Sequence, residues 1–319
     1  MALKIIQSMK PEVSIKHLIH KALAGSEEPR GVSTIHASDL FKSKEFCPRE
    51  RAFQDLGIVK PKSEFVGTAL RITFQHGKDM ENRFRNDWLP HLLVGFWKCG
   101  VCGKKHPTFG RAPKSSCSTC GWNRWEYEEV RVFDEESGVS GGVDALLDVG
   151  EAKLLPVELK SMDKDEHRKL AGPLSEHRIR TGLYLYLIEK CGEDWTKRIN
   201  TKTSKILYVS KSYGFKDTSL SDAGISDSPF SPFKEFSVGR DDKNILVPLQ
   251  RAKALTKWRK LGEQSPATGL PCGICHNGLT KRAQQCSAVG PCFSGSYPST
   301  LTWTENGVVK HLGKPIVVE

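Results

Sequence analysis

The spacing of apolar positions predicts a protein of the α/β (α+β) class, in which helices flank a mixed central sheet. Four segments look like strands, and we expect them over residues 123–133, 143–149, 154–160 and 205–209. Helices are expected over residues 66–89, which end at Pro90, and over 165–190 and 245–261. The first of these helices carries an imperfect apolar stripe made of Leu70, Phe74, Met80, Phe84 and Trp88.

Glycines and polar stretches separate these elements. Gly138, Gly141 and Gly142 are expected to form a turn before the strand at residue 143. Residues 211–233 are rich in Ser, Asp, Gly and Pro, so they are expected to form a loop. Residues 1–30 are polar and are expected at the periphery, and no internal repeat is present.

The composition favours a polyanionic partner. The chain of 319 residues is 38% hydrophobic, which is enough for a core, and it carries 48 basic against 37 acidic residues. A basic surface attracts nucleic acid and releases counterions on binding, although basicity alone is equally typical of an ordinary solvated surface. No apolar stretch has the length of a membrane span and no signal core is visible, so a soluble intracellular (cytoplasmic) protein is expected.

The stretch from Gly141 to Lys160 places acidic and basic groups at the ends of two predicted strands. If the two strands pair as a hairpin, Asp144 and Glu158 reach one metal ion at the same end of the sheet. Lys160 follows Glu158 by two residues, and side chains at that spacing share one face of a strand. Carboxylates hold Mg²⁺ or Mn²⁺, and a lysine can orient a water or stabilise negative charge. The alternative is an ordinary hairpin with a solvated, charged end.

The run Gly142-Val143-Asp144, followed by Val157-Glu158-Leu159-Lys160, resembles the core of the PD-(D/E)XK nuclease superfamily. The resemblance is to its RecB-like branch, which includes the iron–sulfur exonucleases of CRISPR adaptation. It implies a restriction-endonuclease-like core, and it covers residues about 34 to 292. It also implies that His76, Asp144 and Glu158 hold the metal with the Leu159 carbonyl, and that Lys160 is the catalytic lysine.

Three further stretches fit the same branch. His76, with Glu81 beyond it, lies where the family carries a metal-binding histidine on an early helix. Lys211 ends a strand that follows the nuclease helix, and Tyr184 matches the tyrosine of the family's Gln-x-x-x-Tyr motif. Arg180 stands where that motif has glutamine, so the usual DNA contact is in doubt there, although an arginine can meet a phosphate. The resemblance thus implies that Arg180, Tyr184 and Lys211 bind nucleic acid.

Two Cys-x-x-Cys-Gly knuckles, at Cys99 and Cys102 and at Cys117 and Cys120, predict a closed four-thiolate zinc site. Each glycine permits the tight turn that points two thiolates at one ion. The site is expected to be structural and to staple an inserted ribbon, with rubredoxin-like iron as the alternative metal. The basic residues around it either contact DNA or form a solvated surface, and they are Lys98, Lys104, Lys105, Arg111 and Lys114.

A second cluster lies near the C-terminus. Taken alone, its four cysteines fit another zinc site. The family resemblance implies instead a [4Fe–4S] cluster, in which Cys47 joins three of these four, and we favour that interpretation. The four are Cys272, Cys275, Cys286 and Cys292. The third cysteine comes later than in the family, so the choice among the four stays open. Cys191 has no partner nearby and is expected to be a small buried residue.

The resemblance divides the chain into an N-terminal helical part of the nuclease domain (1–95), a zinc ribbon (96–122), a nuclease core (123–261) and a C-terminal cysteine-cluster region (262–319). It implies a nuclease acting on DNA ends, more in the manner of an exonuclease than of an endonuclease. The setting it suggests is recombination, repair or phage and mobile-element DNA processing in a host cytoplasm. A helicase, a recombinase or a single-strand-binding protein would be the partner. The alternatives are a non-catalytic zinc-ribbon DNA-binding protein and, less favoured, an iron–sulfur redox protein.

Overall fold

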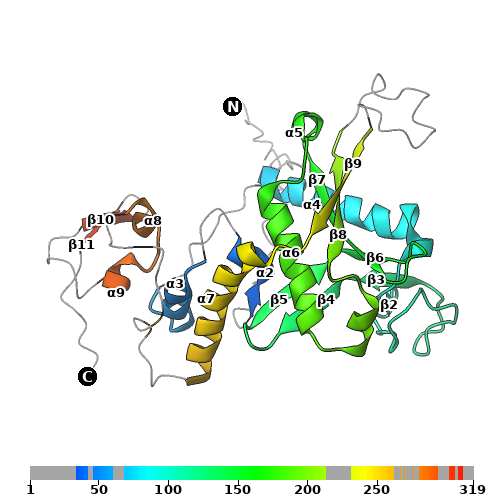
Figure 1. The fold of residues 1–319 in the computed structure, drawn as a ribbon, viewed down its shortest axis with the longest axis horizontal. Coiled ribbons are helices and arrows are strands. Elements are labelled where there is room, and N and C mark those ends of the chain that lie inside the picture. The colour runs from blue at the N-terminus through cyan, green and yellow to red at the C-terminus, as the bar shows by residue number, and fades with distance from the viewer. Residues whose placement is uncertain are drawn as a thin grey trace, which may run out of the picture.

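The computed structural model describes residues 34–41, 46–59, 68–212, 231–261, 267, 270, 275 and 280–293, and the backbone of 302–305 and 308–311. Of the four sheets within these residues, the two larger ones lie side by side and helices cover them (Figure 1). The expected mixed α/β class, with helices around mixed sheets, is therefore confirmed. No helix of the described residues is both long and apolar enough to cross a bilayer.

The first sheet has four strands in the order β6-β7-β8-β9. Strand β7 (Leu155–Met162) pairs antiparallel with β6 (Ala145–Leu147) and parallel with β8 (Thr203–Ser210). A parallel pair needs a crossover, which α5 (Lys164–Lys169) and α6 (Ser175–Lys190) supply. The predicted pairing of the strand after Asp144 with the strand that carries Glu158 is thus present.

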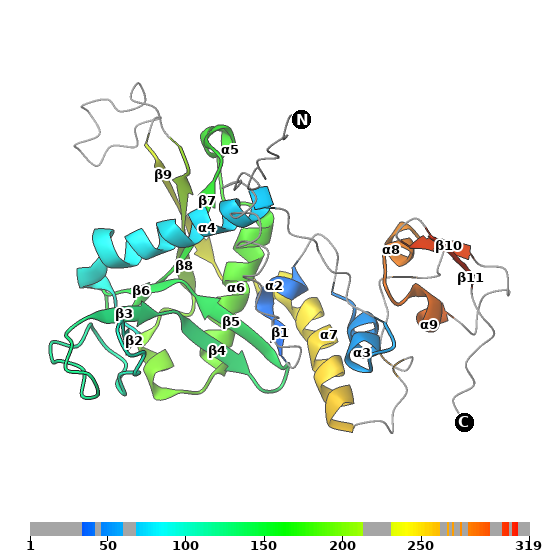
Figure 2. The ribbon, with the colours of Figure 1, turned by 180° about the vertical axis from the view of Figure 1, so that it is seen from behind.

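The second sheet has three strands in the order β1-β5-β4. Strand β5 (Val139–Val143) pairs parallel with β1 (Ile35–His36) and antiparallel with β4 (Val130–Asp134). Helix α6 spans the two sheets and contributes Leu183, Leu185, Leu187 and Ile188, all fully buried, to the main core. Helix α7 (Asp242–Leu261) packs along α6 and α3 (Pro48–Asp55) (Figure 2).

Several boundaries differ from the prediction. Gly141 and Gly142 lie inside β5 rather than in a turn, because the turn comes earlier and ends at Gly138. The segment 165–190 is two helices, since Pro173 lies in the break between them. Strand β9 (Phe233–Gly239) falls partly in the expected loop, whose residues 213–230 lie outside the described residues.

The helix expected over 66–89 is α4 (Thr68–Arg83) followed by a π-helical turn, η1 (Phe84–Trp88). The expected apolar stripe is not a core stripe, because Leu70 and Phe74 are about half exposed and only Phe84 of the five is buried. Helix α4 nonetheless contacts β7 and lies across the sheet face near that strand (Figure 2). It thereby brings polar side chains to the strand that carries Glu158.

The remaining elements are short. They are α2 (Ala37–Leu40), η2 (Pro90–Leu92), β2 (Phe96–Cys99), β3 (Trp125–Glu128), η3 (Asp194–Arg198), α8 (Lys281–Gln284), α9 (Val289–Phe293), β10 (Thr302–Glu305) and β11 (Val308–His311). Strands β2 and β3 pair antiparallel and form the base of the cysteine ribbon, so the ribbon continues past residue 122.

Candidate active site and metal centres

Strand pairing sets Asp144 beside Glu158. The β6–β7 register pairs Ala145 with Val157, so the residue before one and the residue after the other are neighbours across the ladder. Both carboxylates are buried, with 9% and 3% of each residue exposed. The backbone N–H of Leu159 donates to Asp144 Oδ2 at 2.8 Å, which holds this carboxylate against β7.

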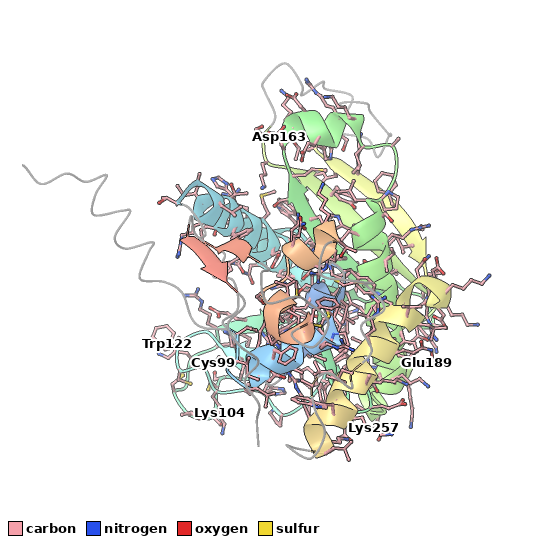
Figure 3. The ribbon with its side chains drawn as sticks, turned by 90° about the vertical axis from the view of Figure 1, so that its left-hand side faces the viewer. Cys99, Lys104, Trp122, Asp163, Glu189 and Lys257 are labelled. Atoms are coloured by element: carbon pink, nitrogen blue, oxygen red, sulfur yellow. The ribbon has the colours of Figure 1, made fainter. Side chains whose placement is uncertain are left out.

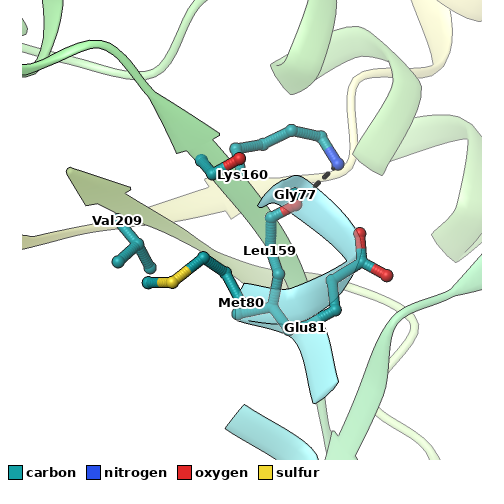
Figure 4. Close-up of a pocket in the computed structure, with 7 residues that line it drawn as sticks. Gly77, Met80, Glu81, Leu159, Lys160 and Val209 are labelled. Atoms are coloured by element: carbon teal, nitrogen blue, oxygen red, sulfur yellow. Dashed lines mark hydrogen bonds between the residues drawn. The ribbon is translucent and has the colours of Figure 1, made fainter. Parts of the chain in front are cut away.

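Lys160 turns back onto the same carboxylates. Its Nζ lies 2.6 Å from Glu158 Oε1 and 3.7 Å from Asp144 Oδ2. The same ammonium donates to the backbone oxygen of Leu159 at 2.7 Å (Figure 4). Three hard oxygen atoms thus surround one positive charge, and they are the three that the resemblance assigns to a metal ion. The Lys160 ammonium occupies the place that a divalent metal ion would take, so this donor set fits Mg²⁺ or Mn²⁺.

The pKa values in this site reflect burial and crowding of like charges. Burial, and then the neighbouring Asp144, raise the pKa of Glu158 to about 7. Burial alone would lower the pKa of Lys160, but Glu158 and Asp144 outweigh it and raise that pKa. Glu158 Oε2 is buried and accepts no hydrogen bond from the described residues. An acceptor left unused in such a place is available to a cation.

Helix α6 covers the carboxylates with Arg180 and Tyr184. Arg180 Nη2 lies 3.4 Å from Glu158 Oε1, so this arginine faces the carboxylate pair. Burial, followed by the charge of Glu158, raises the pKa of Tyr184. The Tyr184 ring lies against Gly141, where an added Cβ would sit 2.7 Å from ring atom Cδ1. Of the residues predicted to bind nucleic acid, these two therefore line the site.

Two further carboxylates, Glu81 and Glu129, join the site. Glu81 on α4 lines a small pocket with Leu159 and Lys160, and burial and Asp144 raise its pKa to about 7 (Figure 4). Glu129 lies across the β4–β5 ladder from Asp144, and burial and Asp144 raise its pKa as well. The sequence offers only weak signals for them: a position on the helix of His76, and an acid just before a strand.

The structure does not bring His76 or Lys211 into this cluster. His76 is exposed on α4, and Glu81 is the side chain from this helix that approaches the carboxylates. Gly77, and not His76, is the residue that faces β7, since a Cβ at Gly77 would lie 3.4 Å from Ser161 Oγ. The backbone N–H of Lys211 donates to the Met162 oxygen, just beyond the end of β8. The metal role of His76 stays a prediction.

The four ribbon cysteines converge as predicted. The Sγ atoms of Cys99, Cys102, Cys117 and Cys120 all lie within 4.8 Å of one another. Backbone N–H groups of the knuckles lower the pKa of the Cys99 thiol and lower that of Cys117 to about 6. The glycine after each knuckle has a positive φ, 72° at Gly103 and 75° at Gly121, which other residues rarely adopt. The geometry fits a tetrahedral zinc ion.

The basic side chains of the ribbon are partly neutralised. Lys105 lies 2.7 Å from Glu128, and Arg111 lies 2.7 Å from Asp148. Lys98 is 4.0 Å from Glu126. Lys104 and Lys114 are exposed, as is Trp122, and Figure 3 shows Lys104 and Trp122 on the ribbon with Cys99. Three of these five basic side chains therefore have an acidic partner within 4.0 Å.

Two cysteines of the second group, Cys47 and Cys292, lie at α3. Cys47 is buried directly before this helix, and Arg49 within it donates to Cys292 Sγ at 3.4 Å. Cys275 and Cys286 belong to one small apolar cluster. Burial lowers the pKa of Arg282, but Glu50 and, after it, these two cysteines outweigh burial and raise that pKa. Cys272 lies outside the described residues. One C-terminal cysteine, Cys292, therefore lies beside the helix that follows Cys47.

No protein-family model and no curated protein matches the sequence. Among solved structures, the crystal structure of SSO0001 is similar at 14% identity, with 90% of this chain and 95% of that chain covered and a TM-score of 0.33. The crystal structure of LHK-Exo in complex with dAMP is similar at 15% identity, with 72% and 89% covered and a TM-score of 0.37. These scores are too low to establish a fold or an activity.

Proposed function

We propose that this protein is a divalent-metal-dependent deoxyribonuclease centred on Asp144, Glu158 and Lys160. The observation that carries the proposal is the convergence of two buried carboxylates and the Leu159 carbonyl on one cationic group. Burying two acids together is costly unless a cation compensates them. A site built in this way is suited to Mg²⁺ or Mn²⁺.

The roles follow from where the groups lie. A bound divalent cation supplies an activated water and neutralises charge on the phosphorane-like transition state. Asp144 and Glu158 would hold it, together with the Leu159 oxygen. Lys160 Nζ would then leave the carboxylates and orient the attacking water or the phosphate oxygen. Arg180 would keep Glu158 ionised, because its guanidinium lies 3.4 Å from that carboxylate.

DNA is the substrate that this chemistry and the net charge of +11 favour. We propose action on DNA ends, as in the RecB-like branch, with His76 as a further metal ligand after a local rearrangement of α4. Tyr184 and Lys211 would contact the strand. A helicase, a recombinase or a single-strand-binding protein would supply the DNA end.

The decisive experiment incubates linear and covalently closed circular DNA with the protein and Mg²⁺ or Mn²⁺. We expect cleavage of the linear form, loss of cleavage with EDTA, and a drop of at least about 100-fold in Glu158→Gln. Glu151→Gln is the matched control, because Glu151 is an exposed acid in the turn before β7. Equal cleavage by Glu158→Gln contradicts the proposal. DNA binding without any cleavage would support the alternative, a non-catalytic zinc-ribbon binding protein.

For the second cysteine group we propose a [4Fe–4S] cluster held by Cys47 and three of Cys272, Cys275, Cys286 and Cys292. The support is the approach of Cys292 to the helix that follows Cys47. Four thiolates also suit a second zinc ion, which is colourless. Anaerobically purified protein should be brown, with absorbance near ~400 nm that Cys47→Ser removes. A colourless protein with two zinc ions per chain would exclude the cluster.

A further inference from the structure

A partly buried arginine, Arg85, contacts the candidate metal ligand Asp144. Its Nε donates to the Asp144 backbone oxygen at 3.0 Å, and its Nη2 lies 3.9 Å from Asp144 Oδ1. Only 12% of the Arg85 side chain is exposed. One planar guanidinium therefore contacts both the backbone and the side chain of the same residue, which a lysine cannot reproduce.

Arg85 reaches this position because it lies in the π-helical turn η1. A π turn contains an extra residue relative to an α-helix, and such turns occur often at functional sites. Glu81, four residues earlier, contacts the same guanidinium nitrogen, with Oε2 at 3.8 Å. The arginine is thus held between two carboxylates of the site.

The Arg85 guanidinium also lies close to a ring of the cysteine ribbon. Arg85 Cζ lies 5.8 Å from the ring centroid of Tyr127, which belongs to the ribbon strand β3. The Tyr127 hydroxyl accepts the N–H of Leu146, two residues after Asp144. Gly95 leaves room for this ring, since a Cβ there would lie 2.6 Å from ring atom Cε2. Tyr127 is therefore closely packed between the ribbon base and the strand that follows Asp144.

From these contacts we infer that Arg85 is a positioning residue, which fixes Asp144 for divalent-cation binding, and that Tyr127 makes this positioning depend on the folded zinc ribbon. The inference rests on the proposed metal site. Residues that orient metal ligands commonly change metal affinity when they are replaced. The ribbon would then stabilise the position of Asp144 in the site, in addition to any contact with DNA.

Two effects of Arg85 on a bound cation oppose each other. Its charge repels the cation, whereas its hydrogen bond orders the ligand. Arg85→Lys keeps the charge and loses the planar contact, and Arg85→Met loses both while keeping an apolar stem. If positioning dominates, both variants bind the cation more weakly. If repulsion dominates, the Met variant binds it more tightly.

The test measures Mn²⁺ binding directly, from the free Mn²⁺ signal in electron paramagnetic resonance, without DNA. We expect about tenfold weaker binding for Arg85→Lys and Arg85→Met, and about threefold weaker binding for Tyr127→Leu. Arg83→Met is the matched control, because Arg83 is exposed in the last turn of α4, and it should bind as wild type does. Circular dichroism confirms that each variant is folded, and Arg85→Lys carries the test if Arg85→Met is not.

The outcomes distinguish a failure of the proposed metal site from a failure of the positioning role of Arg85. If Glu158→Gln binds Mn²⁺ as well as wild type does, the proposed metal site itself is wrong. If Glu158→Gln loses Mn²⁺ but the Arg85 variants keep it or bind it more tightly, the positioning role is overturned. Removal of zinc from the wild-type ribbon should weaken Mn²⁺ binding as much as Tyr127→Leu does. Unchanged Mn²⁺ affinity after zinc removal would overturn the part assigned to the ribbon.

Discussion

The ammonium nitrogen of Lys160 lies 2.6 Å from Glu158 Oε1, and the two residues are two positions apart on β7. The ion pair forms because both side chains lie on the same face of the strand and the lysine side chain folds back toward Glu158. The same ammonium also meets Asp144 and the Leu159 oxygen. A divalent cation bound here would have to displace this ammonium, so Lys160 would compete with the proposed metal ion and be released by it.

Lys160→Met should therefore separate metal binding from cleavage. Removal of the competing ammonium should leave Mn²⁺ affinity unchanged or higher, because the carboxylates lose their internal cation. Cleavage of linear DNA should fall about 10²- to 10³-fold, since the group that stabilises developing charge is gone. Mn²⁺ titration and single-turnover cleavage measure the two effects. Cleavage at the wild-type rate would exclude a catalytic role for Lys160.

Metal affinity should rise with pH up to about 7. Glu158 and Glu81 each have a pKa of about 7, and a divalent cation binds only their ionised forms. Below that pH the cation has to displace protons, so its apparent affinity falls, and above it the affinity levels off. Mn²⁺ titrations at a series of pH values should show this profile. Glu81→Gln should make the slope shallower, and an identical slope would exclude Glu81 as a participant.

The same shift has a consequence for stability without metal. The folded pKa of Glu158 is raised from 4.5, so the folded state keeps a proton that the unfolded chain releases. The free energy of unfolding should therefore fall as pH rises between about 4.5 and about 7. Urea midpoints of the metal-free protein should show this decrease, and it should be smaller in Glu158→Gln. A urea midpoint that rises with pH over this range in wild type but not in Glu158→Gln would contradict the raised pKa of Glu158.

Arg180 should stabilise the carboxylate pair as well as contact DNA. Arg180→Ala leaves Glu158 with one cation fewer in a buried site, and we expect a loss of about 1–3 kcal/mol in the free energy of unfolding. Arg180→Gln restores the residue of the related motif and should lose less, because an amide still donates to Glu158. Urea denaturation measures both. Arg178→Ala, at an exposed position of α6, is the control and should change little.

The glycine pair before Asp144 should respond unequally to alanine. At Gly141 the new Cβ would meet the Tyr184 ring, which packs against the core, at 2.7 Å and Leu187, which lies in the core, at 3.2 Å. At Gly142 it would collide with the Glu129 carboxylate, which ends a flexible side chain that can move away. Gly141→Ala should therefore cost about 1–3 kcal/mol and Gly142→Ala less. Thermal unfolding measures the order, and the reverse order would contradict this packing.

How far the sequence predicts a feature depends on how local that feature is. The Cys-x-x-Cys-Gly knuckles are local, because the turn and the positive φ of Gly103 and Gly121 are set within a few residues. The shared face of Glu158 and Lys160 follows from the two-residue period of a strand. Both features can therefore be predicted from the sequence alone. Helix α4 shows the reverse case, since an apolar stripe is visible in its sequence, but Leu70 and Phe74 are about half exposed and only Phe84 of the stripe is buried.

Tertiary structure alone decided which groups surround Asp144. Glu81 and Arg85 come from α4 and the π-helical turn after it, and Glu129 lies between β3 and β4. The sequence around these residues gives at most a weak signal that they meet at this site. The contact between Arg180 and Glu158 could not be predicted from the sequence either. A sequence motif does not say whether a guanidinium points toward Glu158 or toward DNA. The sequence by itself determined the chemistry of the strand and the knuckles, since those depend on short-range geometry. The folded chain determined the charges around them, since long-range contacts arise only when distant elements share one core.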